Sequence, residues 1–214
     1  MKLTEKTLLW DWNGTLLDDA GTCIDTMNEM LSKRGMPILN LELYKEVFGF
    51  PVIDYYRKIG FNFSRESFEQ ISVEFIDSYN LALGDAPLAI HARPVLDFFK
   101  NAGKDNVIVS AMRQDMLERS VRDKDLENYF TAILGIGDIY TASKSHKATE
   151  YVKSRDLVLD EVVFIGDTLH DYEVACGIGC RCILVADGHQ SEKRLIATGA
   201  EVIPSLKELL NSIV

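Results

Sequence analysis

Four short apolar runs, each ending in a polar residue, constrain the fold of this chain more than any other feature. They are TLLWD (7–11), NVIVS (106–110), VVFIGD (162–167) and RCILVAD (181–187). Continuous apolar runs rich in Val, Ile and Leu are typical of strands that are buried on both faces of a parallel sheet. We therefore expect a parallel sheet at the centre of the fold.

Helical patterns follow these runs. Residues 92–102 carry Val95, Leu96 and Phe99 on one side of a predicted helix. Similar patterns occupy residues 145–155, 170–176, 191–198 and 204–213. Strand followed by helix, repeated along the chain, predicts an α/β fold with a doubly wound, mostly parallel sheet and right-handed crossovers.

Residues 19–85 break this rhythm, because they contain no convincing strand. Helical spacing of apolar residues marks 21–34, 51–60 and 64–83, and Ser64 is the predicted N-cap of the last helix. The chain is therefore predicted to have two domains. An α/β core comprises residues 1–18 and 86–214, and an all-helical cap of residues 19–85 is inserted after the first strand.

The charge balance limits the possible partners. The 214 residues include 23 Lys and Arg against 33 Asp and Glu, a net charge of −10. Nucleic acids and anionic membrane surfaces are bound through Lys and Arg, so neither is an expected partner. The N-terminal apolar run is too short for a secretion signal, and no stretch approaches the ~20 residues of a membrane span. We expect a cytoplasmic monomer or homodimer with a small-molecule ligand.

Cysteine usage gives a weaker signal. The four cysteines are Cys23, Cys176, Cys180 and Cys182, and the last three form a C-x3-C-x-C cluster. Such a cluster can hold a metal, but its members fall at a helix end and in an apolar strand. Free Cys packs as a small hydrophobe, so buried structural thiols are the preferred interpretation.

The polar residues at the strand ends are the candidates for chemistry, because open α/β sheets bind ligands beyond the carboxyl ends of their strands. Asp11, Ser110 and Asp167 end strands, and Asp171 lies one helical turn after Asp167. Three converging carboxylates repel one another unless a hard cation such as Mg²⁺ lies between them. Helix capping is the alternative explanation for each Asp taken singly.

These motifs resemble the haloacid dehalogenase superfamily of aspartyl-phosphate-forming hydrolases, in the branch with a helical cap after the first strand. The family pattern is a strand ending in D-x-D-G-T, a second strand ending in Ser or Thr, a Lys opening a helix, and G-D-x-x-x-D after a later strand. The matching residues are 11–15 (DWNGT), Ser110, Lys144 and 166–171 (GDTLHD). The order and spacing hold over nearly the whole chain.

The resemblance implies a role for each matching residue. Asp11 would be the nucleophile, and Mg²⁺ would be held by Asp11, the backbone carbonyl of Asn13, Asp167 and, directly or through water, Asp171. Phosphate would meet the Ser110 hydroxyl, the backbone N–H of Ala111 and the Lys144 ammonium group. Lys147 is the alternative to Lys144. Trp12, beside the nucleophile, is a candidate substrate contact, with packing in the core or cap as its alternative.

The chain departs from the family pattern at Asn13, where the second Asp of the motif is expected. That Asp serves as general acid and base in the family, and a carboxamide can do neither near neutral pH. Esters of low-pKa leaving groups and acyl phosphates should suffer least. A compensating acid could come from the cap or from His170, although an exposed residue at the start of a helix is the simpler interpretation of His170.

A few other residues are weaker candidates. The loop containing His189 and Gln190 could approach the rim of the site, although a loop leading into a helix is the default interpretation. The cap turn 48–51 (FGFP) is a candidate specificity element. Arg57 could meet a second substrate anion, with a surface charge as the alternative.

The resemblance therefore predicts a Mg²⁺-dependent phosphatase that acts on a small organic phosphate monoester through an aspartyl phosphate. Phosphoglycolate-type and sugar-phosphate substrates come first. The alternatives are a phosphoryl-transferring mutase, a dehalogenase, and a catalytically weak protein that binds a phospho-ligand or a protein partner. Fold-level analogy does not fix the substrate.

Overall fold

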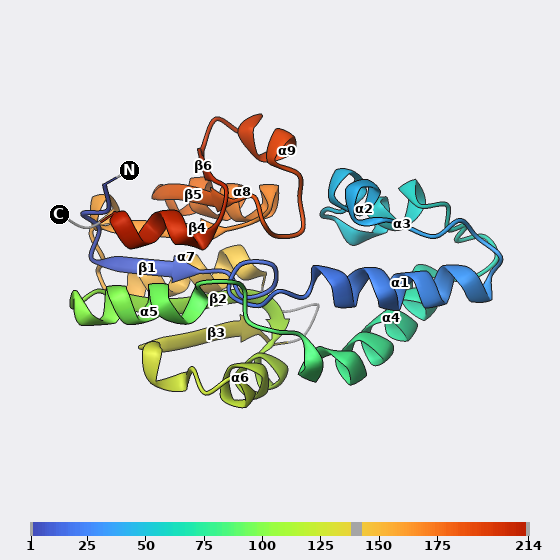
Figure 1. The fold of residues 1–214 in the computed structure, drawn as a ribbon, viewed down its shortest axis with the longest axis horizontal. Helices are drawn as coiled ribbons and strands as arrows, with labels where there is room; N and C mark the ends of the chain where they lie inside the picture. The colour runs from blue at the N-terminus through green and yellow to red at the C-terminus, as the bar shows by residue number, and fades with distance from the viewer. Residues whose placement is uncertain (1, 138–142, 213–214) are drawn as a thin grey trace.

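A six-stranded, wholly parallel sheet forms the centre of the computed structural model, which describes residues 2–137 and 143–212 (Figure 1). The strands are β1 (Thr7–Trp10), β2 (Asp105–Arg113), β3 (Ala132–Ile136), β4 (Val162–Gly166), β5 (Arg181–Val185) and β6 (Glu201–Ile203), in the order β3-β2-β1-β4-β5-β6. The predicted α/β fold with a doubly wound parallel sheet is confirmed. β1 lies at the centre, where the strand order reverses.

Helices cover both faces of the sheet. Alternate strand residues point to opposite faces, and the residues on both faces are apolar. Leu8 and Trp10 of β1 pack in one core cluster, and Leu9 packs in the other. The first cluster includes side chains of α5 (Ala92–Asn101), α6 (Gln114–Asp123) and the 3₁₀ helix η4 (Leu206–Asn211). The second includes side chains of α7 (Lys144–Ser154), α8 (Leu169–Ile178) and α9 (Glu192–Ile196).

The helices between β1 and α5 gather beyond the end of β1 (Figure 1). They are α1 (Ala20–Lys33), α2 (Leu41–Val47), α3 (Val52–Lys58), α4 (Phe68–Ala82) and the short 3₁₀ helix η1 (Leu83–Asp85). All of residues 19–85 are described, and none of them lies in a strand. The outgoing and returning connections run side by side, since the Asp18 N–H donates to the Pro87 carbonyl at 2.9 Å and Leu17 bridges Leu88.

The elements that went unpredicted include β3, β6 and α2, and each of these has a weak pattern. β3 is only half-buried, and Gly135 interrupts its apolar run. β6 has three residues. α2 has seven residues, of which only Tyr44 is buried, and the Asn40 side chain caps it by accepting from the Leu43 N–H.

The predicted helices differ from the structure in two details. Ser67, not Ser64, is the N-cap of α4, where it forms a capping box with Gln70. The Ser64 side chain bonds to Asn62 instead. The pattern at 204–213 predicted a helix, and the described part forms the 3₁₀ helix η4; residues 213 and 214 lie outside the described residues.

The four thiols are free, and their burial differs. Cys23 and Cys182 are buried as predicted and Cys180 is half-buried, whereas Cys176 is exposed, so the prediction of burial was wrong for Cys176. Among the described residues, the C-x3-C-x-C cluster does not gather into a candidate metal site. No helix in the described ranges is both long enough and apolar enough to cross a membrane.

Candidate active site

Asp11 follows β1 directly and lies at the carboxyl edge of the sheet. Its N–H continues the ladder by donating to the Ile165 carbonyl of β4 at 2.8 Å. This pairing brings Asp11 beside the end of β4, where Asp167 and Asp171 follow. One carboxylate oxygen from each of the three residues lies within 4.8 Å of the others, and all three side chains are buried. We call these three residues the carboxylate cluster.

Lys144 is the cation of the carboxylate cluster. Its Nζ lies 2.6 Å from Asp11 Oδ1 and 2.5 Å from Asp171 Oδ1, and the residue is only 3% exposed. Burial acts to lower the pKa of Lys144, but the charges of Asp11 and Asp171 outweigh it and raise that pKa above its ordinary value. Lys147, the alternative motif lysine, is half-buried further along α7 and makes no ion pair with any described residue.

Asp167 is held by two donors. Its Oδ1 accepts from the Thr15 hydroxyl at 2.8 Å, and its Oδ2 accepts from the His189 backbone N–H at 2.7 Å. Two glycines make this packing possible, because a Cβ built at Gly14 or Gly188 would lie 2.3 or 2.2 Å from Asp167 Oδ2. Gly14 also has a φ of +75°, which favours glycine.

Asp171 is the third residue of α8 and forms a capping box with Thr168. Its Oδ2 accepts from the N–H of Asp167, the N–H of Thr168 and the Thr168 hydroxyl, and its Oδ1 faces Lys144. Both oxygens are therefore engaged. Of the two modes expected from the sequence, this occupancy favours contact with a metal through water.

The carboxylate cluster carries more negative than positive charge. Burial, followed by repulsion from Asp171 and Asp167, raises the pKa of Asp11 to about 8 despite Lys144. Burial and the Asp171 charge likewise raise the pKa of Asp167 to about 6, against the attraction of His189. A divalent cation would offset this charge, and the oxygen donors suit Mg²⁺. The residues present therefore fit the divalent metal that the resemblance implies.

Ser110 and Ala111 lie where β2 passes the carboxyl edge. Ser110 is buried and its Oγ accepts from the Met112 N–H at 3.1 Å. Its own hydroxyl hydrogen is donated to none of the described residues and can therefore meet a ligand. It does not cap α6, which begins at Gln114. Ala111 is exposed.

Trp12 does not present its side chain to the carboxylate cluster in this structure. It is fully buried, and its indole N–H donates to the Ser120 hydroxyl at 3.0 Å. This placement matches the alternative of core packing. The predicted contact between the Trp12 side chain and substrate is therefore not supported.

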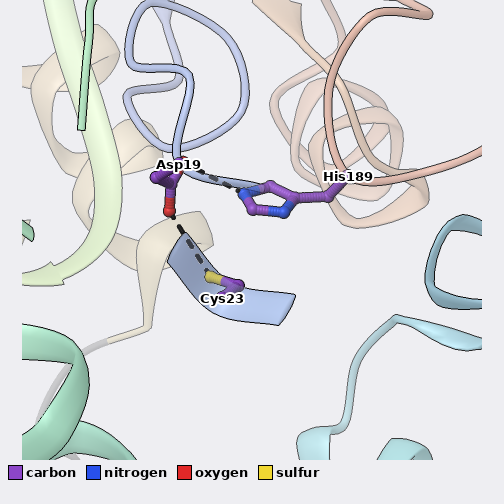
Figure 2. A group of neighbouring side chains, drawn as sticks. All are labelled: Asp19, Cys23 and His189. Carbon is purple, nitrogen blue, oxygen red and sulfur yellow. Dashed lines mark hydrogen bonds and ion pairs between the residues drawn. The ribbon is translucent and has the colours of Figure 1, made fainter. Parts of the chain in front are cut away.

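A second buried group adjoins the carboxylate cluster and is centred on Asp19, the residue before α1. Figure 2 shows Cys23 and His189 both pointing toward the Asp19 carboxylate. Asp19 Oδ1 lies 3.3 Å from His189 Nε2, and Oδ2 lies 3.6 Å from Cys23 Sγ. The Tyr79 hydroxyl donates to Oδ2 at 2.6 Å, and the Gly14 N–H donates to Oδ1 at 2.8 Å. We call this group the Asp19 network.

The Asp19 network is balanced in charge. Burial acts to raise the pKa of Asp19, but the His189 charge and hydrogen bonds from His189 and Tyr79 hold it below its ordinary value. Burial acts to lower the pKa of His189, and the Asp19 charge outweighs it and raises that pKa to about 9. The remaining ring nitrogen, Nδ1, lies 2.8 Å from the Tyr44 hydroxyl of α2.

Residues that follow β5 also contact the all-helical segment of residues 19–85. Gln190 accepts from the Leu169 N–H and donates to the Phe48 carbonyl. Arg194 donates to the carbonyls of Lys45 and Phe48, at 2.9 and 2.6 Å. The turn at 48–51 therefore lies against the residues that follow β5.

The two remaining candidates lie at the periphery. His170 is half-buried in the first turn of α8, 3.4 Å from Glu173 and beside the ring of Phe50. Arg57 forms an exposed ion pair with Asp54. Neither makes a hydrogen bond or ion pair with the carboxylate cluster among the described residues.

Sequence reasoning missed Thr15 and Asp19 and undervalued His189. His189 comes two residues after the polar end of the fourth predicted strand, so the rule about strand ends already pointed to it. Asp19 follows another Asp at the predicted domain boundary, and nothing local distinguishes the two. Burial separates them, since Asp18 is exposed and Asp19 is buried.

Comparisons with known proteins agree with this geometry. The family model for haloacid dehalogenase-like hydrolases matches residues 8–185. Tyrosine-protein kinase PtkA of Mycobacterium tuberculosis is 24% identical over 212 residues, covering 95% of this chain and 72% of that protein. A phosphoglycolate phosphatase of Photorhabdus laumondii is 20% identical over 239 residues, covering 97% and 92%.

The fold has solved counterparts. A haloacid dehalogenase-like hydrolase from Streptococcus pneumoniae superposes with a TM-score of 0.82 at 15% sequence identity, covering 96% of this chain and 97% of that one. At this identity the likeness shows the fold alone.

Proposed function

Because this chain belongs to the haloacid dehalogenase-like hydrolase family, we propose that it is a Mg²⁺-dependent phosphatase that hydrolyses a small organic phosphate monoester. The observation that carries the proposal is the carboxylate cluster, where three buried carboxylates gather and only two of them, Asp11 and Asp171, are paired with the Lys144 ammonium group. Excess negative charge at the carboxyl edge of a parallel sheet suits a divalent cation and, with it, a phosphate group.

Asp11, Asp167 and the backbone carbonyl of Asn13 would hold the ion, with Asp171 contacting it through water. When bound, Mg²⁺ would screen the negative charges of nucleophile and phosphate from each other and keep the two in line.

Asp11 is the proposed nucleophile. Its Oδ1 is paired with Lys144, and its Oδ2 accepts no hydrogen bond from any described residue. Attack by Oδ2 on phosphorus breaks the bond from phosphorus to the ester oxygen and forms an aspartyl phosphate. The leaving oxygen takes its proton from solvent, because the amide of Asn13 cannot supply one. Attack by water on the same phosphorus then releases phosphate and regenerates the carboxylate. Two moderate barriers replace one high barrier.

Lys144 and Ser110 would support both steps. The Lys144 ammonium group neutralises Asp11 and can meet a phosphate oxygen, and Asp171 holds it in place. The Ser110 hydroxyl and the Ala111 N–H would donate to the phosphate oxygens on which charge develops.

Residues 19–85 would act as a cap over a core of residues 1–18 and 86–214. The paired connections at Asp18 and Pro87 support these boundaries. Contacts of Phe48 with Gln190 and Arg194 would hold the cap closed and exclude water from the reacting groups.

A phosphoglycolate-type or sugar-phosphate substrate is proposed first. The relative named as a phosphoglycolate phosphatase, which matches nearly the whole chain, supports this choice. A phosphoryl-transferring activity is the second candidate, because another relative is named as a tyrosine-protein kinase.

The test is phosphate release from a panel of phosphorylated metabolites, with and without Mg²⁺. The proposal expects turnover that requires the metal and is abolished by Asp11→Asn. Transfer of phosphate to a hydroxyl acceptor, with no release to water, would favour the second candidate. Phospho-ligand binding without turnover would contradict both.

A further inference from the structure

The side-chain amide of Asn13 has only one group left for a ligand. Its Nδ2 donates to Asp19 Oδ2 at 3.1 Å and to the Tyr79 hydroxyl at 2.8 Å, which uses both amide hydrogens. Its Oδ1 accepts from none of the described residues. A flipped amide would place Oδ1 against a carboxylate oxygen, so the surroundings fix which atom is free.

Asp19 fixes the orientation of the Asn13 amide, because an ionised carboxylate can only accept hydrogen bonds. It is 1% exposed and takes donors from Gly14, Tyr79, His189 and Cys23 in addition to Asn13. The Tyr79 hydroxyl gives its hydrogen to Asp19 and therefore presents its oxygen to Asn13. Both hydrogens of the amide are thus held by one buried carboxylate, directly or through Tyr79.

We propose that Asp19 is a positioning residue that makes Asn13 a pure hydrogen-bond acceptor in the active site, and that the carboxylate at position 19 is what requires an amide at position 13. The inference rests on the proposed phosphatase function for its meaning in catalysis. Oδ1 can orient an O–H group of water or substrate without removing its proton.

The departure from the family motif then has a physical cause. A carboxylate at position 13 would lie about 3 Å from that of Asp19, in a buried setting where two like charges strongly disfavour each other. Restoring the family residue at position 13 alone is therefore not expected to restore acid–base catalysis. Exchanging the two side chains keeps one carboxylate and one amide in contact.

A metal ion is not needed to explain the Asp19 network. Ligand atoms of Asp19, Cys23 and His189 do lie within 4.8 Å of one another. However, both Asp19 oxygens already accept several hydrogen bonds, and His189 is paired through both ring nitrogens.

The test is a double-mutant cycle of Asn13→Asp, Asp19→Asn and the exchanged pair, read by melting temperature and by kcat and KM. Asn13→Asp should lower the melting temperature by about 5 °C or more and should not raise kcat. The exchanged pair should recover most of that loss, with kcat at least about tenfold above that of Asn13→Asp. Asp18→Asn, at an exposed neighbouring position, is the matched control and should leave the melting temperature, kcat and KM unchanged.

Several outcomes would overturn the proposal. The first is Asn13→Asp alone raising kcat with no loss of stability. The second is one Zn²⁺ per chain in the purified protein that Cys23→Ser removes, since Asp19 would then be a metal ligand. A purely structural link would restore melting temperature in the exchanged pair and leave kcat unrecovered, which also contradicts a positioning role.

The melting temperatures of the double-mutant cycle can be compared whether or not the protein has phosphatase activity. Coupling between positions 13 and 19 in a wild-type protein without phosphatase turnover would refute the proposed function and leave the pairing intact. Phosphatase turnover with additive effects of the two substitutions would refute the pairing alone.

Discussion

Two buried acidic groups lie side by side in this protein, and they solve the same electrostatic problem differently. In the carboxylate cluster, one lysine pairs with two of the three carboxylates, and the pKa values of Asp11 and Asp167 are raised. In the Asp19 network, one carboxylate meets a histidine and several donors, and the pKa of Asp19 is lowered. The carboxylate cluster therefore needs added positive charge to offset its carboxylates, whereas the Asp19 network needs no further cation.

The difference shows what burial of an acidic residue indicates. A buried carboxylate with enough partners is part of the protein's own packing, and a buried set with too few partners indicates a ligand. His189 belongs to both groups, since its backbone N–H holds Asp167 and its ring holds Asp19. Because only the carboxylate cluster has excess negative charge, removing one of its carboxylates should stabilise the metal-free protein, whereas removing the Asp19 carboxylate should destabilise it.

The largest effect is expected for Asp11→Asn. Removal of the nucleophile should lower phosphatase turnover at least about 10³-fold. The same substitution removes one of three repelling carboxylates, so the metal-free melting temperature at pH 8 should rise by a few degrees. Asp18→Asn, the exposed control, should leave both unchanged. A metal-free Asp11→Asn protein less stable than wild type would show that the carboxylate cluster is already neutralised.

Lys144→Met should be the most destabilising change in the carboxylate cluster. It leaves buried carboxylates without their cation, at a cost of about 3–5 kcal/mol. For a chain of this length the metal-free melting temperature should fall by about 10 °C. Lys147→Met is the matched control and should shift it by less than about 2 °C. Equal effects of the two substitutions would contradict the assignment of Lys144, rather than Lys147, as the cation of the carboxylate cluster.

The pH dependence of metal-free stability should separate the two groups by sign. Asp11 and Asp167 bind their protons more tightly in the folded protein, because their pKa values are raised to about 8 and about 6. Their contribution to the free energy of unfolding is therefore lost as the pH rises from about 4 through these two values. The contribution of His189 is lost between 6.5 and about 9. The Asp19 contribution is lost instead as pH falls below 3.8.

Melting temperatures of metal-free protein should therefore decline from pH 5 to pH 9. Saturating Mg²⁺ should remove the part of the decline that comes from Asp11 and Asp167 and leave the part from His189. Thermal melts at each pH, with and without the metal, measure both parts. A decline that Mg²⁺ does not change would contradict the assignment of the metal to the carboxylate cluster.

The smallest effect is expected for Cys23→Ser. The thiol supplies one weak, 3.6 Å hydrogen bond to an Asp19 carboxylate that has other donors. A hydroxyl can supply the same bond, so the melting temperature should change by about 2–4 °C or less. Cys176→Ser, at an exposed position, should have no effect. A fall of 10 °C or more would mean that the thiol does more than donate one hydrogen bond.

Much of the fold could be read from local pattern, because the continuous apolar runs of β1, β2, β4 and β5 are typical of strands buried on both faces of a parallel sheet. The edge strands β3 and β6 are largely half-buried, and β6 has only three residues, so their pattern is too weak to detect. The motif carboxylates could be named because strand ends converge, and Lys144 could be named through the resemblance to the family pattern. The Asp19 network joins positions 19, 23, 79 and 189, and no local pattern reports contacts over such separations.

Calorimetric titration of Mg²⁺ into the metal-free protein tests the difference between the two groups most directly. We predict one ion per chain in the wild-type protein, no measurable binding in Asp167→Asn, and unchanged binding in Lys147→Met. Equal Mg²⁺ binding by wild type and Asp167→Asn would contradict the account, because the ion would then lie outside the carboxylate cluster.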